Sequence, residues 1–254
     1  MNKSYFHRGG ERPLLGSTIP EHFAAIAAKF PDNEAVVCTP QNRRLSYAEL
    51  SEEIDRVARG LLAVGFGRDD RIGVWSTNNI EWLLLQMATA RIGAVLVNIN
   101  PAYRIKELAY ALKRSEVQGL FVIPSFRSSN YVAMLMELMP QLESAAWDAL
   151  DLDEDFKHLR RLFIYDPSDP EHTGRPASGF GTWQDLLQAS DKVSQQEIEE
   201  VTAALDMDDA INIEYTSGTT GFPKAVVLTH HNIPNHAYFS LEAIGFDETQ
   251  PFSV

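Results

Sequence analysis

Nine consecutive residues near the end of the sequence combine glycine, hydroxyl and lysine side chains, residue types that can bind phosphate. They are Thr216, Ser217, Gly218, Thr219, Thr220, Gly221, Phe222, Pro223 and Lys224. Glycine adopts left-handed conformations without steric cost, so the two glycines let backbone N–H groups turn toward an anion. The hydroxyl groups add donors that can rotate onto phosphate oxygens, and Lys224 adds a full positive charge. These residues are therefore predicted to form a loop that binds the phosphates of a nucleotide.

The segment differs from the P-loop of the Walker type. That loop needs Gly-Lys followed by Ser or Thr and then a helix, whereas here two residues separate Gly221 from Lys224 and the strand-like residues 225–228 follow. A surface turn rich in Ser, Thr and Gly is the alternative interpretation. It does not explain a lysine placed after a rigid proline between two apolar segments, so phosphate binding is the favoured hypothesis.

At these residues the chain resembles the adenylate-forming superfamily, which includes acyl-CoA synthetases, the adenylation domains of peptide synthetases, and luciferases. In that family the loop closes over the β- and γ-phosphates of ATP while a carboxylate attacks the α-phosphate. The resemblance continues at residues 45–50 (LSYAEL), 70–74 (DRIGV), 97–101 (VNINP) and 229–232 (THHN). Together these motifs are most similar to those of medium- and long-chain fatty acyl-CoA synthetases.

The resemblance implies a ligase that uses ATP, Mg²⁺ and CoA. A fatty acid carboxylate would attack the α-phosphate of Mg-ATP to give acyl-AMP and pyrophosphate, and the thiol of CoA would then displace AMP. The loop over residues 216–224 would hold the leaving pyrophosphate. Family members usually carry glycine after the motif lysine, whereas this chain has Ala225. Alanine would be strained there if the backbone needed a positive φ, and harmless if a strand has begun.

The resembled enzymes are longer than this chain, and that difference predicts a partial protein. Residues 1–254 are expected to be a truncated N-terminal AMP-binding domain without the C-terminal domain. The family's groups for adenine, ribose and Mg²⁺, and its catalytic lysine, are expected beyond Val254, so the catalytic residues are unknown and the chain alone is predicted to be inactive. Two alternatives stay open: adenylation of another carboxylate, such as an aryl or amino acid, and a non-catalytic nucleotide-binding or scaffolding module.

Composition excludes several classes of partner. The net charge of −13 argues against nucleic acid, which demands clustered Lys and Arg. The single cysteine, Cys38, excludes an internal disulfide and a cysteine-based metal site. No stretch approaches the roughly 18 apolar residues of a membrane span, and residues 1–17 lack an apolar secretion segment. We expect small-molecule substrates, a cytoplasmic protein with the mitochondrial matrix as second option, and a chain compatible with a homodimer.

Hydrophobic periodicity predicts an α/β fold, with βαβ layers and a mostly parallel sheet flanked by helices. Helices are predicted over residues 19–30, 46–65, 80–92, 103–113, 131–138 and 183–187, and strands over 35–38, 44–45, 71–75, 94–99, 119–123, 161–165, 211–215 and 225–228. Ser46 and Glu49 predict a capping box. Residues 140–155 and 166–181 are expected to be loops, and 194–209 only weakly helical.

Two further groups of polar residues could carry chemistry, an acidic segment and a pair of histidines, but each has a simpler structural interpretation. The acidic group Asp148, Asp151, Asp153, Glu154 and Asp155 could pair carboxylates for acid–base chemistry, but a solvated loop is favoured. His230 and His231 are adjacent, so their side chains point in different directions, and His236 is outside the i, i+4 spacing. No metal site is predicted from these histidines.

Overall fold

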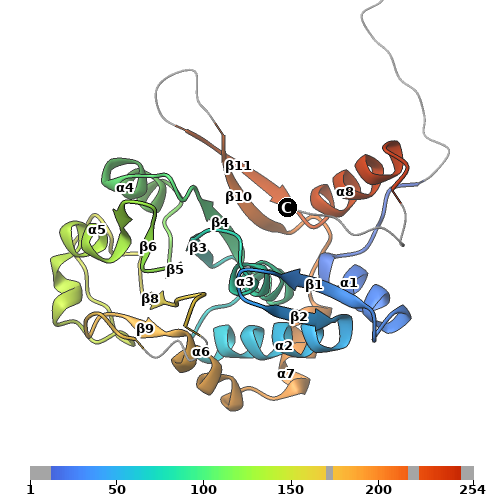
Figure 1. The fold of residues 1–254 in the computed structure, drawn as a ribbon, viewed down its shortest axis with the longest axis horizontal. Coiled ribbons are helices and arrows are strands. Elements are labelled where there is room, and N and C mark those ends of the chain that lie inside the picture. The colour runs from blue at the N-terminus through green and yellow to red at the C-terminus, as the bar shows by residue number, and fades with distance from the viewer. Residues whose placement is uncertain (1–12, 170–173, 217–222, 247–254) are drawn as a thin grey trace, which may run out of the picture.

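The computed structural model describes residues 13–169, 174–216 and 223–246 (Figure 1). Within these residues the largest sheet has seven strands, in the order β11-β10-β4-β3-β5-β8-β9. The strands are β3 (Arg71–Trp75), β4 (Val95–Ile99), β5 (Gly119–Val122), β8 (Arg161–Ile164), β9 (Gly181–Thr182), β10 (Ala210–Thr216) and β11 (Lys224–Thr229). Every neighbouring pair is parallel except β10 and β11, which are antiparallel. The predicted α/β fold with a mostly parallel sheet is confirmed.

Helices cover both faces of this sheet (Figure 1). The lower face in that view carries α1 (Ile19–Lys29), α2 (Tyr47–Ala63), α3 (Ile80–Arg91), α6 (Trp183–Ala189) and α7 (Gln195–Ala203). The opposite face, on the left in that view, carries α4 (Ile105–Arg114) and α5 (Tyr131–Leu138). The chain runs from β3 through α3 to β4, and then back past β3 through α4 to β5. Right-handed crossovers in opposite directions place α3 and α4 on opposite faces.

Helix α2 shows how local sequence fixes an element. The Ser46 hydroxyl accepts a hydrogen bond from the Glu49 N–H at 3.2 Å, and the Glu49 carboxylate accepts one from the Ser46 N–H at 2.8 Å. This capping box satisfies two N–H groups that the helix itself cannot. Leu50, Ile54, Val57, Ala58 and Leu61 then form the buried face. Gly65, with φ of +92°, ends the helix in the left-handed conformation that favours glycine.

Several smaller elements differ from the sequence-based prediction. The hairpin of β1 (Glu34–Cys38) and β2 (Arg43–Ser46) is confirmed, but β9 lies at the end of a segment predicted as a loop, and the pair β6 (Ser125–Phe126) and β7 (Ser129–Asn130) was not predicted. Helix α4 begins at Ile105 rather than 103, because the Tyr103 N–H bonds the Asn100 carbonyl in a preceding turn. Helix α7 is regular because Ser194 and Glu197 form a capping box at its start.

The last described helix, α8 (Asn232–Ala243), returns to the beginning of the chain. The Asn235 side chain accepts a hydrogen bond from the Leu15 N–H at 2.7 Å and donates one to the Leu15 carbonyl at 3.0 Å. These bonds place α8 beside the segment that leads into α1 (Figure 1). In the described part of the chain, no helix combines the length and apolar character needed to cross a membrane.

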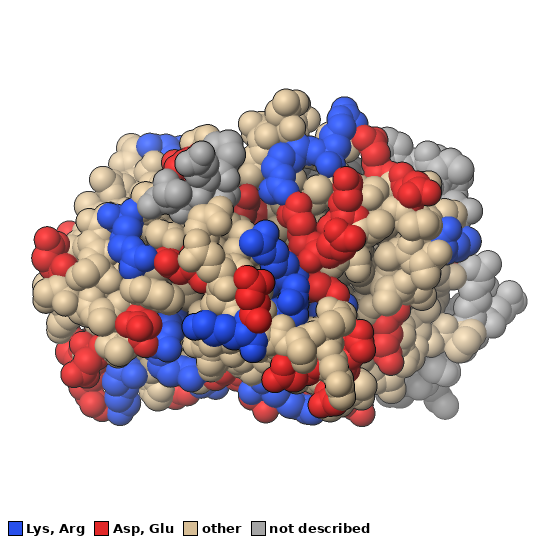
Figure 2. Space-filling view, turned by 90° about the horizontal axis from the view of Figure 1, so that it is seen from below, with Lys and Arg blue, Asp and Glu red and all other residues tan. Residues whose placement is uncertain are grey.

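Acidic and basic side chains are interspersed over the face that carries α2, α6 and α7 (Figure 2). Several of them form ion pairs on or beside α2, such as Arg91 with Asp55 at 3.0 Å and Arg43 with Glu53 at 2.6 Å. These pairs are partly buried, so their attraction is offset by the cost of removing the charges from water. The pattern is that of a solvated surface over a core that lies between these helices and the sheet.

Candidate functional site

The candidate phosphate loop begins and ends on a β-hairpin at the carboxyl edge of the parallel strands. Thr216, the last residue of β10, is paired with Lys224, the first residue of β11. The Thr216 hydroxyl is 3.5 Å from the Lys224 carbonyl oxygen. The predicted loop residues between them, Ser217, Gly218, Thr219, Thr220, Gly221 and Phe222, lie outside the described residues. Strand pairing thus fixes both ends of the candidate loop.

The ammonium of Lys224 is available to bind an anion. Lys224 is exposed, and within the described ranges its side chain takes part in no ion pair. Thr216 is exposed beside it, and Pro223 is half-buried. An exposed cation and an exposed hydroxyl therefore lie side by side at the carboxyl edge of the sheet, and both are groups that can donate hydrogen bonds to an anion.

Ala225 lies in a regular strand. It is paired with Tyr215 across the hairpin, and it is not among the residues of positive φ in the described part of the chain, which are Asn42, Asp69, Glu116 and Arg127 besides three glycines. An extended backbone accepts any residue, so alanine after the motif lysine carries no backbone strain. The sequence left two outcomes open for Ala225, and the structure has the harmless one.

On the face toward α4, two tyrosines hold the hairpin. The Tyr215 hydroxyl donates to the Ala111 carbonyl at 3.1 Å and is 2.6 Å from the Ser115 hydroxyl. The Tyr110 hydroxyl donates to the Pro223 carbonyl at 3.3 Å. Burial raises the pKa of Tyr215, so its hydroxyl stays protonated as a donor near neutral pH. Sequence reasoning missed these contacts, because α4 and the hairpin are about a hundred residues apart in the chain.

On the opposite face, a carboxylate lies beneath the hairpin. The Glu214 carboxylate accepts hydrogen bonds from the side-chain amides of Asn98 and Asn212, and Gln86 of α3 donates to Asn212 at 2.7 Å. Alternate residues of a strand share a face, so Glu214, Thr216 and the paired Lys224 lie on the same side of the sheet. The sequence indicates this polar face, because polar residues stand at every second position of an otherwise apolar strand.

An apolar groove of about 540 Å³ opens on this same face of the sheet. Its walls come from α1, α3 and α8, and Glu214 lies at its floor beside Asn98 and Asn212. The apolar lining consists of Ile19, Phe23, Ile26, Trp82, Met87, Ile233 and Pro234. The groove therefore combines apolar walls with a polar floor that leads along β10 toward Thr216.

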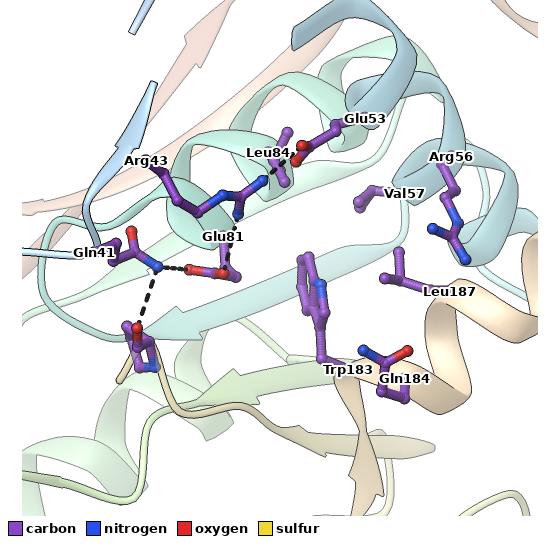
Figure 3. A pocket seen from close by; sticks show the side chains of 11 residues that line it. Gln41, Arg43, Glu53, Arg56, Val57, Glu81, Leu84, Trp183, Gln184 and Leu187 are labelled. Carbon is purple, nitrogen blue, oxygen red and sulfur yellow. Dashed lines mark hydrogen bonds and ion pairs between the residues drawn. The ribbon is translucent and has the colours of Figure 1, made fainter. Parts of the chain in front are cut away.

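A second cavity, of about 310 Å³, lies between α2, α3, α6 and the turn that joins β1 to β2 (Figure 3). The buried Glu81 carboxylate accepts a hydrogen bond from Gln41 at 2.8 Å and is 3.7 Å from the Arg43 guanidinium. Arg43 also pairs with Glu53 at 2.6 Å. The Arg43 guanidinium thus lies between the buried Glu81 and the half-buried Glu53, and the Gln41 amide is a further donor to Glu81. We interpret the cluster as the anchor of the β1–β2 turn on α3.

His230 joins the end of β11 to α1. Its Nδ1 accepts a hydrogen bond from the Ile19 N–H at 3.2 Å, so the ring proton of the neutral form is on Nε2. The ring is fully buried, and burial lowers the pKa of His230 from its ordinary value. The backbone N–H of the adjacent His231 bonds the Met207 carbonyl at 2.8 Å. His230 therefore has a packing role between distant segments.

The acidic group near residue 150 is a solvated segment, as favoured by the sequence. All five carboxylates, Asp148, Asp151, Asp153, Glu154 and Asp155, are exposed. Asp155 forms an ion pair with Lys113 at 2.6 Å, and Glu154 forms one with Lys157. In the described ranges, no three His, Cys, Asp or Glu side chains are grouped so that they could hold a metal ion.

Comparison with known proteins places this geometry in a family. The family model described as "AMP-binding enzyme" matches residues 23–251. The chain belongs to the AMP-binding enzyme family. Among its relatives in this family, medium-chain acyl-CoA ligase ACSF2, mitochondrial, of Danio rerio is 36% identical over 247 residues, which are 97% of this chain and 39% of the relative. The putative acyl-CoA synthetase YngI of Bacillus subtilis is 38% identical over 224 residues, 88% of this chain and 39% of the relative.

Solved structures of AMP-binding enzymes share the fold. The anthranilate CoA ligase AuaEII, in complex with anthranoyl-AMP, has a TM-score of 0.69 at 17% identity, over 90% of this chain and 37% of that structure. The long-chain-fatty-acid-CoA ligase FadD1 of Archaeoglobus fulgidus has a TM-score of 0.68 at 22% identity, over 96% of this chain and 42% of that structure. The predicted resemblance to adenylate-forming enzymes is confirmed, and the chain spans about 39% of the length of the ACSF2 and YngI relatives.

Proposed function

We propose that the parent enzyme of this chain activates a fatty acid with ATP through acyl-AMP and passes the acyl group to CoA. The observation that carries the proposal is the exposed Lys224, placed by strand pairing opposite Thr216 at the carboxyl edge of the sheet in a chain of the AMP-binding family. In open α/β sheets, ligands bind outside the carboxyl ends of the strands. The names of the ACSF2 and YngI relatives, an acyl-CoA ligase and a putative acyl-CoA synthetase, support this reaction class.

In this proposal the hairpin of β10 and β11 binds the triphosphate of ATP. Thr216, Lys224 and the residues between them would hold the β- and γ-phosphates and then the leaving pyrophosphate, with Pro223 stiffening the exit. Preorganised donors of this kind act by stabilising charge as it develops, and removing one costs on the order of 2 to 4 kcal/mol. Mg²⁺, which usually enters such sites bound to substrate phosphates, would neutralise part of their charge.

The apolar groove supports a fatty acid as the carboxylate. It lies on the face of the sheet that also carries Lys224, and apolar side chains from α1, α3 and α8 form its walls. Alkyl chains gain about 0.8 kcal/mol for each buried CH₂ group, so such walls favour an acyl chain over a charged amino acid. The cytoplasm stays the predicted compartment, with the mitochondrial matrix as the second option.

We further propose that residues 1–254 form one part of the N-terminal domain of a longer enzyme. The chain spans about 39% of the ACSF2 and YngI relatives, so the residues that bind adenine and orient the carboxylate would come from the remainder. Residues 1–254 alone are expected to give no adenylation. Fatty-acid-dependent exchange of pyrophosphate into ATP by this chain would overturn that expectation.

The test of the proposed function is ATP–pyrophosphate exchange by the full-length enzyme. The panel contains medium- and long-chain fatty acids, benzoate and anthranilate, and several amino acids, each assayed with and without Mg²⁺. Formation of the CoA thioester is then followed for every acid that supports exchange. We expect exchange and thioester formation with fatty acids. Exchange with aryl or amino acids alone would favour the alternative carboxylates, and silence with the whole panel would favour a scaffolding module.

A further inference from the structure

Within the described residues, few contacts reinforce the strand pairing at the end of the hairpin that carries Lys224. Thr216 and Lys224 form the last pair of the described ladder, and the Thr216 hydroxyl is 3.5 Å from the Lys224 carbonyl, the long limit of a hydrogen bond. Pro223 precedes this pair and has no N–H to donate. The nitrogen of Pro223 thus adds no hydrogen bond to the ladder, and a contact at its carbonyl would reinforce this end of the hairpin.

Tyr110 supplies that contact from α4. Its hydroxyl donates to the Pro223 carbonyl at 3.3 Å, and its ring meets that of Tyr215 edge-on at 6.4 Å between centroids. The helix behind it is rigid, because Leu108 and Leu112 are buried in the core on the same element. A hydrogen bond from such a helix constrains the backbone at Pro223, the residue next to the lysine.

The other limb of the hairpin has its own anchor. The Tyr215 hydroxyl donates to the carbonyl of Ala111, the residue after Tyr110 on the same helix, and lies 2.6 Å from the Ser115 hydroxyl. Tyr215 therefore holds the limb that enters the candidate loop, and Tyr110 holds the limb that leaves it. Only the leaving limb carries Lys224, so the two tyrosines are expected to have separable effects.

We propose that Tyr110 is a positioning residue that sets Lys224 for the triphosphate by fixing the backbone at Pro223. The inference rests on the proposed function of the hairpin. If the ammonium is already held in place before ATP binds, little conformational entropy is lost when the phosphates bind. If the end of the strand is mobile, that entropy is lost during binding and ATP is bound more weakly. Tyr110 does not touch the reacting atoms in this arrangement, and it acts through Pro223 on the lysine.

The test compares Tyr110→Phe with Tyr103→Phe in the full-length enzyme. Tyr103 interacts electrostatically with Tyr110 and Tyr215, but no described residue accepts a hydrogen bond from its hydroxyl, so the control loses the same group without breaking a described hydrogen bond to the hairpin. We expect Tyr110→Phe to lower kcat/KM for ATP about two- to tenfold, the range of one neutral hydrogen bond, with an unchanged KM for the fatty acid. Tyr103→Phe should match the wild type.

Two readouts separate positioning from a general loss of structure. Supplied acyl-AMP and CoA bypass the triphosphate, so thioester formation from acyl-AMP should be unchanged in Tyr110→Phe. Hydrogen exchange should be faster at the amides of residues 224–229 in Tyr110→Phe than in Tyr103→Phe. Equal exchange in the two variants, an unchanged kcat/KM for ATP, or an equal loss in both half-reactions would each overturn the proposal. If the wild type supports no ATP–pyrophosphate exchange, the proposed function fails, while the hydrogen exchange still decides whether Tyr110 holds the strand.

Discussion

Replacing Lys224 with methionine removes the charge from the hairpin and keeps most of the aliphatic stem. Lys224 is exposed and takes part in no ion pair within the described residues, so the change should leave folding stability within about 0.5 kcal/mol of the wild type. The effect should therefore appear in the ATP step. An ammonium about 4 Å from a phosphate charge contributes about 1 kcal/mol in bulk water and about 4 kcal/mol near a protein surface from which water is partly excluded.

These limits correspond to a fall in kcat/KM for ATP of about fivefold if the site stays open to water, and of about a thousandfold if it closes. The assay is ATP–pyrophosphate exchange by the full-length enzyme, with thermal unfolding as the check on folding. Lys106→Met is the matched control, because Lys106 is an exposed lysine on α4. An adenylation rate equal to that of the wild type, or an equal loss in Lys106→Met, would remove Lys224 from the mechanism.

Two further predictions concern stability. Gly119→Ala would place a Cβ 2.3 Å from Phe66 Cζ, so we expect urea unfolding to show a free energy of unfolding about 1 to 3 kcal/mol lower. Gly67→Ala is the control, because its Cβ would meet no atom within 4 Å and its free energy of unfolding should change little. Equal urea midpoints for the two variants would contradict the packing. His230 has a folded pKa below its unfolded value of about 6.5, so its contribution is fully present above pH 6.5 and is lost as the pH falls through the folded pKa. His230→Asn, whose side-chain oxygen can accept the Ile19 N–H, should flatten this dependence in urea midpoints measured from pH 7.5 to 5, and an unchanged slope would assign it to other groups.

The elements predicted well from the sequence are those whose signals are local. The capping box of Ser46 and Glu49, the apolar face that follows it and the left-handed Gly65 are all within twenty residues of one another. The strands of the parallel sheet are short apolar segments bounded by turns, so periodicity found each of them except β9. That strand has two residues, Gly181 and Thr182, and its pairing with β8 is a tertiary contact with no local pattern.

The sequence predicted which residues form the candidate site, and their binding of phosphate stays a prediction, whereas the contacts that support the site were not predictable. Thr216 and Lys224 were recognised from residue types alone, and the structure adds that they face each other across a hairpin. The contacts of Tyr110 and Tyr215 with that hairpin and α4 join residues about a hundred positions apart, and nothing in their neighbours in sequence signals the partner. Glu214 is the exception, since a polar residue in an apolar strand is itself a local signal that it faces something other than the core.

The position of β10 in the sheet has a consequence for biosynthesis. It lies beside β4 although 116 residues separate Asn98 from its partner Glu214. Ribosomes add about 5 to 20 residues per second, so the edge of β4 that pairs with β10 stays unpaired for about 6 to 23 s while the intervening residues are synthesised. During that interval the strands β3, β5 and β8 can already assemble. The hairpin of β10 and β11 would therefore be the last part of the sheet to form, and a nascent chain interrupted before residue 210 would present an unpaired edge of β4 to chaperones.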